Sequence, residues 1–166
     1  MQLRTVFSLL GQTLRDRPGA LAQRLIAAPA ILLALGAASP QTGVDITVTV
    51  TGLRNADGVV RACMTHEPAS FPKCRGVEGA QGMAVPVAES DTLTFRNVRP
   101  GRYAIALLHD ENDNGKADRA ALMIPSEGFG FSRDARVRMG PPRFEDAAFD
   151  VAGKPQALSI RMRYVL

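Results

Sequence analysis

The chain has 166 residues, of which 46% are hydrophobic and 22% are charged, the balance of a globular protein long enough for one domain with its own core. Its formal net charge is +4, but residues 1–38 hold four arginines against one aspartate, so the remainder carries 16 basic and 15 acidic side chains. A nearly neutral domain lacks the cationic surface that binds a phosphate backbone, which excludes nucleic acid as the expected partner.

Residues 1–38 have the pattern of a secretory signal peptide. An arginine-bearing stretch precedes an apolar run from Leu25 to Ala38, which is shorter than the roughly 20 residues that span a bilayer. The run ends in small residues of the kind that signal peptidase cuts, so we expect cleavage near residues 36–38 and a periplasmic or secreted protein without a membrane span. An uncleaved anchor stays the alternative, because the arginine-bearing stretch is long.

The exported part, residues 39–166, begins with a half-buried strand. In VDITVTVT, residues 44–51, valine and isoleucine occupy every second position, so that one face is apolar and the other polar. A turn signal follows at Asp57-Gly58, and VVRACM, residues 59–64, then predicts the second strand of a hairpin with the first.

Cys63 and Cys74 are the only cysteines of the chain and stand eleven positions apart. In an exported protein the oxidising compartment favours joining them, and closing a loop of this size would stabilise the fold by about 3 kcal/mol. Two separately buried thiols, or a metal pair with His66, are the alternatives. We predict the disulfide.

The rest of the chain reads as further short strands separated by glycine, proline and serine. The expected strands are residues 83–88, at a sheet edge because Pro86 cannot donate a ladder hydrogen bond, and residues 92–98, 102–110, 144–151 and 157–166. About seven short strands in one exported domain predict an all-β fold, an antiparallel β-sandwich of immunoglobulin-like or transthyretin-like Greek-key type.

HDENDNGKAD, residues 109–118, is the densest run of oxygen-bearing side chains. It contains D-x-N-x-N-G-x-x-D, the first nine positions of a calcium loop, in which alternate side chains point inward and a glycine permits the sharp turn. We expect Ca²⁺ to be bound there by oxygens of Asp110, Asn112, Asn114 and Asp118 and by the carbonyl of Lys116.

The motif departs from an EF-hand at its twelfth position, where Ala121 stands in place of the bidentate glutamate. Glu127 is the nearest residue with the chemistry to close the shell. Few well-placed anions predict a modest affinity, a Kd of roughly 0.1–1 mM as in extracellular modules. The alternative is an Asx-rich turn without an ion, and Mg²⁺ is disfavoured because it demands a stricter octahedron.

Three motifs in order carry a family resemblance: RPGRYAIALLHDENDNGKAD, IPSEGFGFS and GPPRFEDAAFDV. Together they resemble the exported bacterial proteins of domain-of-unknown-function family 2141 over residues 44–165. The calcium-like loop is also similar, over a shorter stretch, to the calcium-binding B-type repeats of bacterial surface adhesins, which are small β-sandwiches. The family has no assigned reaction, so the resemblance implies fold and export and leaves the function open.

Residues 124–149 contain Gly128, Gly130 and Gly140 beside Phe129, Phe131 and Phe144, and we expect these phenylalanines to pin a long Ω-like loop to the sandwich. A ligand-facing loop is the alternative, in which Glu127, Ser132 and Arg133 meet His109 and Asp110 at one end of the domain. For His109 itself we favour the interpretation as a core histidine at the end of an apolar strand face, because a lone histidine without partners is a weak signal of function.

Two classes of function follow. The first is a non-catalytic exported module with a weak calcium-binding loop, whose end loops bind an envelope or extracellular protein or glycan. The second is a small periplasmic hydrolase that uses His109 with Ser132 or a metal-bound water. Since the sequence contains no G-x-S-x-G and no H-E-x-x-H motif, the module is the preferred hypothesis.

Overall fold

The computed structural model describes residues 42–120 and 124–166, which lie within one compact unit. The predicted signal peptide and Ala121 lie outside these residues. The strands are β1 (Val44–Thr51), β2 (Val59–Thr65), β3 (Gln81–Pro86), β4 (Thr92–Val98), β5 (Gly101–Asp110), β6 (Gly128–Phe131), β7 (Phe149–Val151) and β8 (Gln156–Arg161). Short helical turns are η1 (Val87–Glu89), η3 (Ser132–Asp134) and α1 (Phe144–Ala147).

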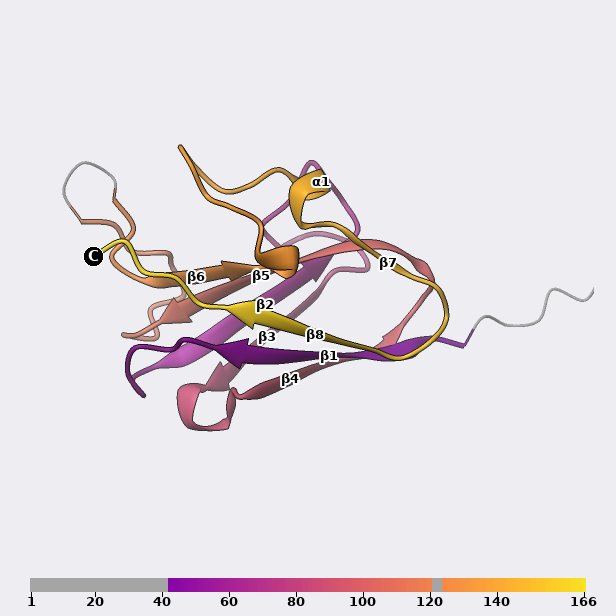
Figure 1. Cartoon of the computed structure of the whole chain (residues 1–166), viewed down its shortest axis with the longest axis horizontal. Helices are drawn as coiled ribbons and strands as arrows, with labels where there is room; N and C mark the ends of the chain where they lie inside the picture. The colour runs from indigo at the N-terminus through magenta and orange to yellow at the C-terminus, as the bar shows by residue number, and fades with distance from the viewer. Residues whose placement is uncertain (1–41, 121–123) are drawn as a thin grey trace, which may run out of the picture. The chain divides into compact units, whose positions relative to one another are not determined.

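The strands form two sheets that pack over each other as a β-sandwich (Figure 1). One sheet has the order β4-β1-β8, and the other has the order β3-β2-β5-β6 with β7 paired to the start of β5. The all-β sandwich is confirmed, and β3 lies at a sheet edge as Pro86 requires. One pairing departs from the antiparallel expectation, because β1 and β8 run parallel.

The predicted hairpin between residues 44–51 and 59–64 is wrong. β1 pairs with β4 and β8, whereas β2 pairs with β3 and β5 in the opposite sheet. Residues 52–58 carry the chain from one sheet to the other. β1 and β2 lie in opposite sheets, and each turns its apolar face toward the core between them. The alternation of apolar and polar residues is therefore the same whether the two strands form a hairpin or lie in different sheets.

Branched and sulfur-containing side chains fill the space between the sheets. The core takes alternate residues from both sheets, with Ile46, Val48, Leu93, Phe95, Val60, Met64, Ile105 and Ile160 all at most 2% exposed. Burial of aliphatic side chains on this scale is the main force that holds the sheets together.

A second, smaller cluster lies on the other face of β5. Ala104 and Ala106 face it from the strand, and Phe131, Phe144 and Ala147 cover them. β5 is therefore buried on both faces. The expected Ω-like loop is wrong in its first part, since residues 128–131 are a strand paired with β5, but Phe131 and Phe144 do pin the segment between them to the sheet. The strand expected at 144–151 is a helical turn followed by the short β7.

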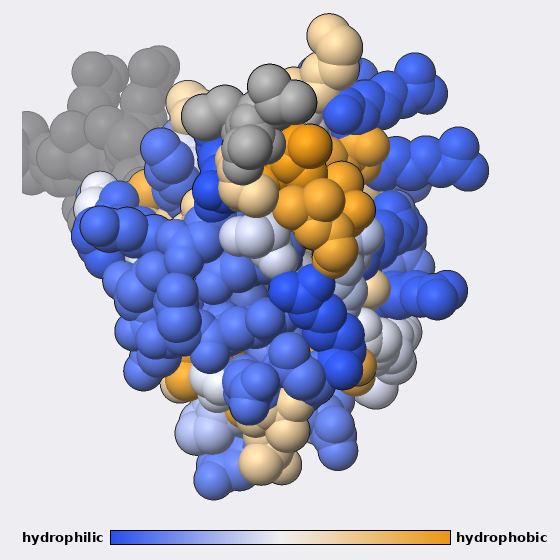
Figure 2. All heavy atoms as spheres, turned by 90° about the vertical axis from the view of Figure 1, so that its left-hand side faces the viewer, coloured by the Kyte–Doolittle hydropathy of each residue, from blue (hydrophilic) through white to orange (hydrophobic). Residues whose placement is uncertain are grey.

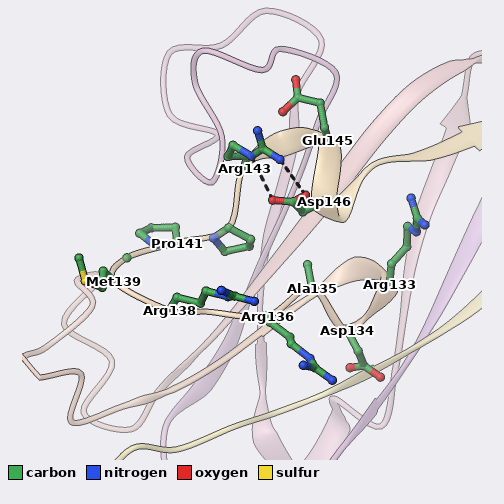
Figure 3. Close-up of a pocket in the computed structure, with 12 residues that line it drawn as sticks. Arg133, Asp134, Ala135, Arg136, Arg138, Met139, Pro141, Arg143, Glu145 and Asp146 are labelled. Carbon is green, nitrogen blue, oxygen red and sulfur yellow. Dashed lines mark hydrogen bonds and ion pairs between the residues drawn. The ribbon is translucent and has the colours of Figure 1, made fainter.

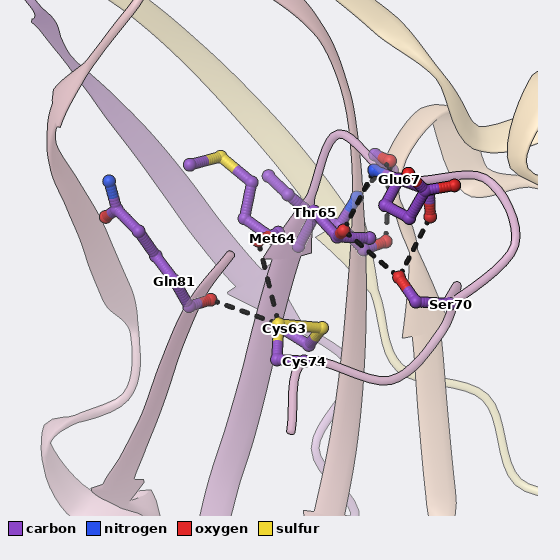
Figure 4. Close-up of a disulfide and its surroundings, with 9 residues drawn as sticks. Cys63, Met64, Thr65, Glu67, Ser70, Cys74 and Gln81 are labelled. Carbon is purple, nitrogen blue, oxygen red and sulfur yellow. Dashed lines mark hydrogen bonds between the residues drawn. A yellow bond between two sulfur atoms is a disulfide. The ribbon is translucent and has the colours of Figure 1, made fainter. Parts of the chain in front are cut away.

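The disulfide between Cys63 and Cys74 is confirmed, with an S–S distance of 2.08 Å (Figure 4). It joins β2 to the loop that follows, so residues 66–73 are held against the sheet. Phe71 in that loop contacts the rings of Phe131 and Phe144 edge to face, at centroid distances of 5.8 and 6.1 Å. The disulfide loop thus helps to cover the second cluster.

In the described part of the chain, no helix combines the length and the apolar character needed to cross a membrane.

Candidate functional site

The loop between β5 and β6, residues 110–120 and 124–127 of the described chain, gathers most of the predicted ligands and is called the acidic loop below. β5 ends at Asp110 because its side chain takes over the hydrogen bonding of the turn: Oδ1 accepts the N–H of Asn114 at 3.0 Å, and Oδ2 accepts the N–H of Gly115 at 2.8 Å. Gly115 adopts a φ of 77°, the left-handed conformation that favours glycine. The motif therefore folds as a chain of Asx turns.

The three other predicted side chains of the motif converge on one another. The amide nitrogens of Asn112 and Asn114 both donate to Oδ2 of Asp118 at 2.8 Å. The amide oxygen of Asn114 accepts the N–H of Lys116 at 2.8 Å, while the Lys116 residue is exposed. The side chains at alternate positions thus point into the loop, as the spacing predicts.

Glu127 lies at the base of the acidic loop and is only 5% exposed. Its two oxygens accept the backbone N–H groups of Glu111 at 3.2 Å and Asp118 at 2.9 Å. Burial raises the pKa of Glu127 above its ordinary value, and the charges of Asp110 and Asp118 add to the rise against these hydrogen bonds. Glu127 is thus brought next to the motif that it was expected to complete.

Arg61 on β2 is a partner of the acidic loop that the motif does not reveal. Its Nε donates to Oδ2 of Asp110 and its Nη2 to Oδ1 of Asp113, both at 2.5 Å. Asp110 is fully buried, and burial acts to raise its pKa, but the hydrogen bonds from Arg61, Gly115 and Asn114 outweigh that effect and hold the pKa below its ordinary value. Asp110 is therefore a buried, ionised and paired carboxylate.

The donor set of the loop suits a hard cation, because it consists of carboxylate, amide and carbonyl oxygens. In this conformation the carboxylates are turned toward N–H groups and Arg61. Accordingly, within residues 42–120 and 124–166, no three His, Cys, Asp or Glu side chains stand in the arrangement of a metal centre. Arg61 supplies one positive charge beside Asp110 and Asp113.

His109 and Ser132 are both fully buried, and the structure does not bring them together. The ring nitrogens of His109 lie 2.7 Å from the Tyr164 hydroxyl and 2.8 Å from the carbonyl oxygen of Asp57. The Ser132 hydroxyl accepts the N–H of Ile105 at 2.9 Å and donates to the carbonyl of Ala147 at 2.6 Å. Both side chains therefore tie loops to β5, and neither is presented to a ligand. Of the three ligand-facing candidates, only Arg133 is exposed.

Arg54 forms a second connection that sequence reasoning did not identify. Its Nε lies 2.6 Å from a carboxylate oxygen of Glu111, its guanidinium stands 4.5 Å from the centre of the Tyr164 ring, and its Nη1 donates to the carbonyl of Leu166 at 2.6 Å. Arg54 thus links the β1–β2 crossing, the acidic loop and the C-terminal residues at one end of the sandwich. Figure 2 shows that hydrophilic side chains cover most of this end.

Comparison with known proteins gives a family. The model described as an uncharacterized protein conserved in bacteria (DUF2141) matches residues 48–159. No curated protein matches the chain. A solved structure titled as the pilus-presented adhesin Spy0125 (Cpa) is similar at 13% identity and a TM-score of 0.33, over 72% of this chain and 26% of the adhesin chain. The chain thus spans about a quarter of that adhesin, and the likeness is too low to support an argument.

Proposed function

We propose that this chain, which belongs to the DUF2141 family of bacterial proteins, is an exported, non-catalytic β-sandwich module with a weak calcium-binding loop. Its end loops would bind an envelope or extracellular protein or glycan. Export is supported by the predicted leader and by the disulfide, since such bonds persist in oxidising compartments.

The calcium proposal rests on Glu127. This carboxylate is 5% exposed and stands beside Asp110 and Asp118. Burial and the neighbouring negative charges destabilise its ionised form, and its pKa is therefore raised. A divalent cation would relieve this excess of negative charge more fully than Arg61 does. The oxygens available to it are those of Asp110, Asn112, Asn114, Asp118, Glu127 and the Lys116 carbonyl.

The absence of catalysis is supported by the hydrogen bonds of the two residues that a hydrolase would use. A nucleophile and its base must share a hydrogen bond, or reach one through the substrate. Ser132 is engaged by Ile105 and Ala147, and His109 by Tyr164 and Asp57. A reaction at this pair would first require both sets of bonds to break in a buried place.

Thermal unfolding with and without calcium tests the metal proposal. With a Kd of roughly 0.1–1 mM, about 5 mM Ca²⁺ stabilises the folded state by about 1–2 kcal/mol over chelator, a rise in Tm of about 5 °C. We expect Asp118→Asn to abolish most of this rise. Asp150→Asn, which changes an exposed aspartate on β7, is the matched control and should retain it. Equal melting curves in chelator and calcium for the unaltered protein would refute the site.

Export is tested on protein recovered from the periplasm of an expressing bacterium. The mature N-terminus should fall near residues 36–38, and a thiol titration of the denatured, unreduced protein should find no reactive group. Elemental analysis of the same material, prepared without chelator, should find calcium. Recovery of a protein with two reactive thiols and an uncleaved N-terminus would contradict export.

A further inference from the structure

Residues 133–143, called the arginine loop below, lead from η3 to α1 and concentrate positive charge. The segment contains Arg133, Arg136, Arg138 and Arg143 against the single acidic residue Asp134. The exported part as a whole carries almost no net charge. This loop is therefore a local cationic surface in a domain, residues 39–166, that is nearly neutral overall.

The fold buries two residues of the loop, one fully and one partly, and leaves the arginines that alternate with them exposed. Ala135 is buried and Val137 half-buried, and both pack on the second cluster with Phe131 and Phe144. Arg136 and Arg138 alternate with them and are exposed. Their exposure is thus set by burial of their neighbours.

Three other charged residues of the arginine loop are already engaged, whereas Glu145, in α1, is exposed and lines the same hollow as the loop. Arg143 pairs with Asp146 at 3.3 Å, and Arg133 donates to the carbonyl of Ala148 at 3.1 Å. Asp134 accepts the N–H of Arg161 at 3.2 Å and lies 3.8 Å from the Arg163 guanidinium. By contrast, neither Arg136 nor Arg138 has a hydrogen-bond or ion-pair partner within residues 42–120 and 124–166.

The two free guanidinium groups face a hollow beside an apolar tip. The hollow has a volume of about 770 Å³ and lies between the two limbs of the loop, with Arg138 projecting between them (Figure 3). Met139 stands at the outer turn of the loop and is fully exposed, in contrast to the buried methionines of the core. Unpaired cations next to an exposed apolar side chain are the two components of surface attachment to an anionic bilayer.

We propose that the arginine loop docks on a phospholipid bilayer that contains anionic lipid. Arg136 and Arg138 present planar forks that match phosphate oxygens, and the hollow gives headgroups room to approach them. Met139 enters the interface between headgroups and acyl chains. An acidic glycan would satisfy the arginines equally but would leave Met139 in water, which is why the bilayer is favoured.

The inference names one envelope partner and so rests on the proposed export, but it uses no residue of the acidic loop. The calcium-dependent rise in Tm is therefore an independent readout. If the protein shows the calcium effect but does not bind bilayers, the docking proposal fails and the calcium proposal stands. If it binds bilayers but shows no calcium effect, the calcium proposal fails and the docking proposal stands.

Co-sedimentation of the purified exported protein with vesicles tests the docking. Vesicles of phosphatidylcholine with about 30% phosphatidylglycerol should bind the protein, pure phosphatidylcholine should not, and about 0.3 M salt should weaken the binding strongly. Arg136→Gln with Arg138→Gln should weaken partitioning about 30-fold. Met139→Ser should weaken it about fivefold and leave the salt dependence unchanged.

Arg99→Gln with Arg102→Gln is the matched control, since it removes the same charge from exposed positions at the β4–β5 turn. This variant should bind within about threefold of the unaltered protein, the loss expected from net charge alone. Equal losses in the two double variants would overturn the proposal, and so would equal binding to both kinds of vesicle. Retention of the protein by dextran sulfate without sedimentation on anionic vesicles would overturn it in favour of an acidic glycan.

Discussion

The acidic loop and the arginine loop show two opposite ways of handling charge in one small domain. In the acidic loop, Asp110 and Glu127 are buried, and each of their carboxylate oxygens accepts at least one hydrogen bond. In the arginine loop, Arg136 and Arg138 are exposed and have no partner among the described residues. Apolar anchors from the second cluster hold the middle of that loop, and polar bonds of Arg133, Asp134 and Arg143 hold its two ends.

This difference separates what holds a loop in shape from what the loop can bind. Buried charges define a single conformation, because breaking any of their bonds leaves a group unsatisfied away from water. Exposed charges on an apolar base contribute little to folding and stay available to a partner. Substitutions in the acidic loop should therefore act on stability first, and substitutions in the arginine loop on association.

Gly58→Ala should have the largest effect. Gly58 has a φ of 64°, and a Cβ there would stand 2.1 Å from the carbonyl oxygen of Asp110, a backbone atom at the root of the acidic loop. We expect a loss of unfolding free energy on the order of 4 kcal/mol by urea denaturation. Gly76→Ala is the control, since Gly76 has a φ of 75° with nothing within 4 Å, and only the conformational penalty of about 1 kcal/mol remains. Equal losses of unfolding free energy in Gly58→Ala and Gly76→Ala would mean that the acidic loop shifts to accommodate the added methyl group at little cost.

Cys63→Ser with Cys74→Ser should follow, with a loss of about 3 kcal/mol from the freed loop entropy of the unfolded chain. The substitution loosens the segment that brings Phe71 onto Phe131 and Phe144, and so acts on the anchoring of the arginine loop. The calcium-dependent rise in Tm should stay within error of the parent value. A loss of that rise would show that the two loops are coupled through β5.

Arg61→Met leaves the buried Asp110 carboxylate with its two backbone hydrogen bonds and no cation. We expect a loss of about 2–3 kcal/mol in chelator, less than for a fully buried pair because the Arg61 side chain is one third exposed. The stabilisation by calcium should increase, since the guanidinium no longer competes for Asp110. Arg96→Met, at an exposed pair with Asp45, is the control and should change neither quantity. If calcium stabilises Arg61→Met no more than the parent, then the ion and the Arg61 guanidinium do not compete for Asp110.

The same variant has a pH signature. The folded-state pKa of Asp110 lies below its unfolded value, so its contribution is complete above the unfolded pKa and is lost as the pH falls through the folded one. Without Arg61 the folded pKa rises. Loss of stability on acidification in chelator should therefore begin at a higher pH than in the parent, as measured by urea midpoints across the acid range.

Arg136→Gln with Arg138→Gln should have the smallest effect on folding. Both side chains are exposed and unpaired in the described structure, so the change in Tm should stay within about 2 °C. A fall as large as that of Arg61→Met would mean that these arginines are structural, which would remove the contrast between the loops.

The sequence predicts which face of each strand is buried much better than it predicts which strand lies alongside. The alternation at residues 44–51 predicts the apolar face of β1 correctly. It does not indicate whether the strand that pairs with β1 is β2, β4 or β8. That choice depends on the seven residues 52–58, which are long enough to cross the sandwich, and on side-chain fit between distant segments. The family resemblance is confirmed by the match over residues 48–159.

The candidate site was predictable to the extent that it is local. The spacing of Asp110, Asn112 and Asn114 predicts a calcium loop, with an Asx-rich turn as the alternative, and the inward-pointing side chains and Asx turns belong to both. Glu127 follows from chemistry and short separation. Arg61 could not be predicted, because its contact depends on the β2–β5 register, in which Val59 stands opposite Asp110. His109 and Ser132 were hypothesised as a reactive pair on chemical type alone, and burial engages each of them with other groups.

The parallel pairing of β1 with β8 has a consequence for the timing of folding. Ile46 lies opposite Gln156, so β1 can complete its pairing only after a segment roughly 110 residues away has been synthesised. At about 5–20 residues per second, that segment follows β1 by some 5–20 s. Until then one flank of β1 offers unsatisfied main-chain groups to any passing strand.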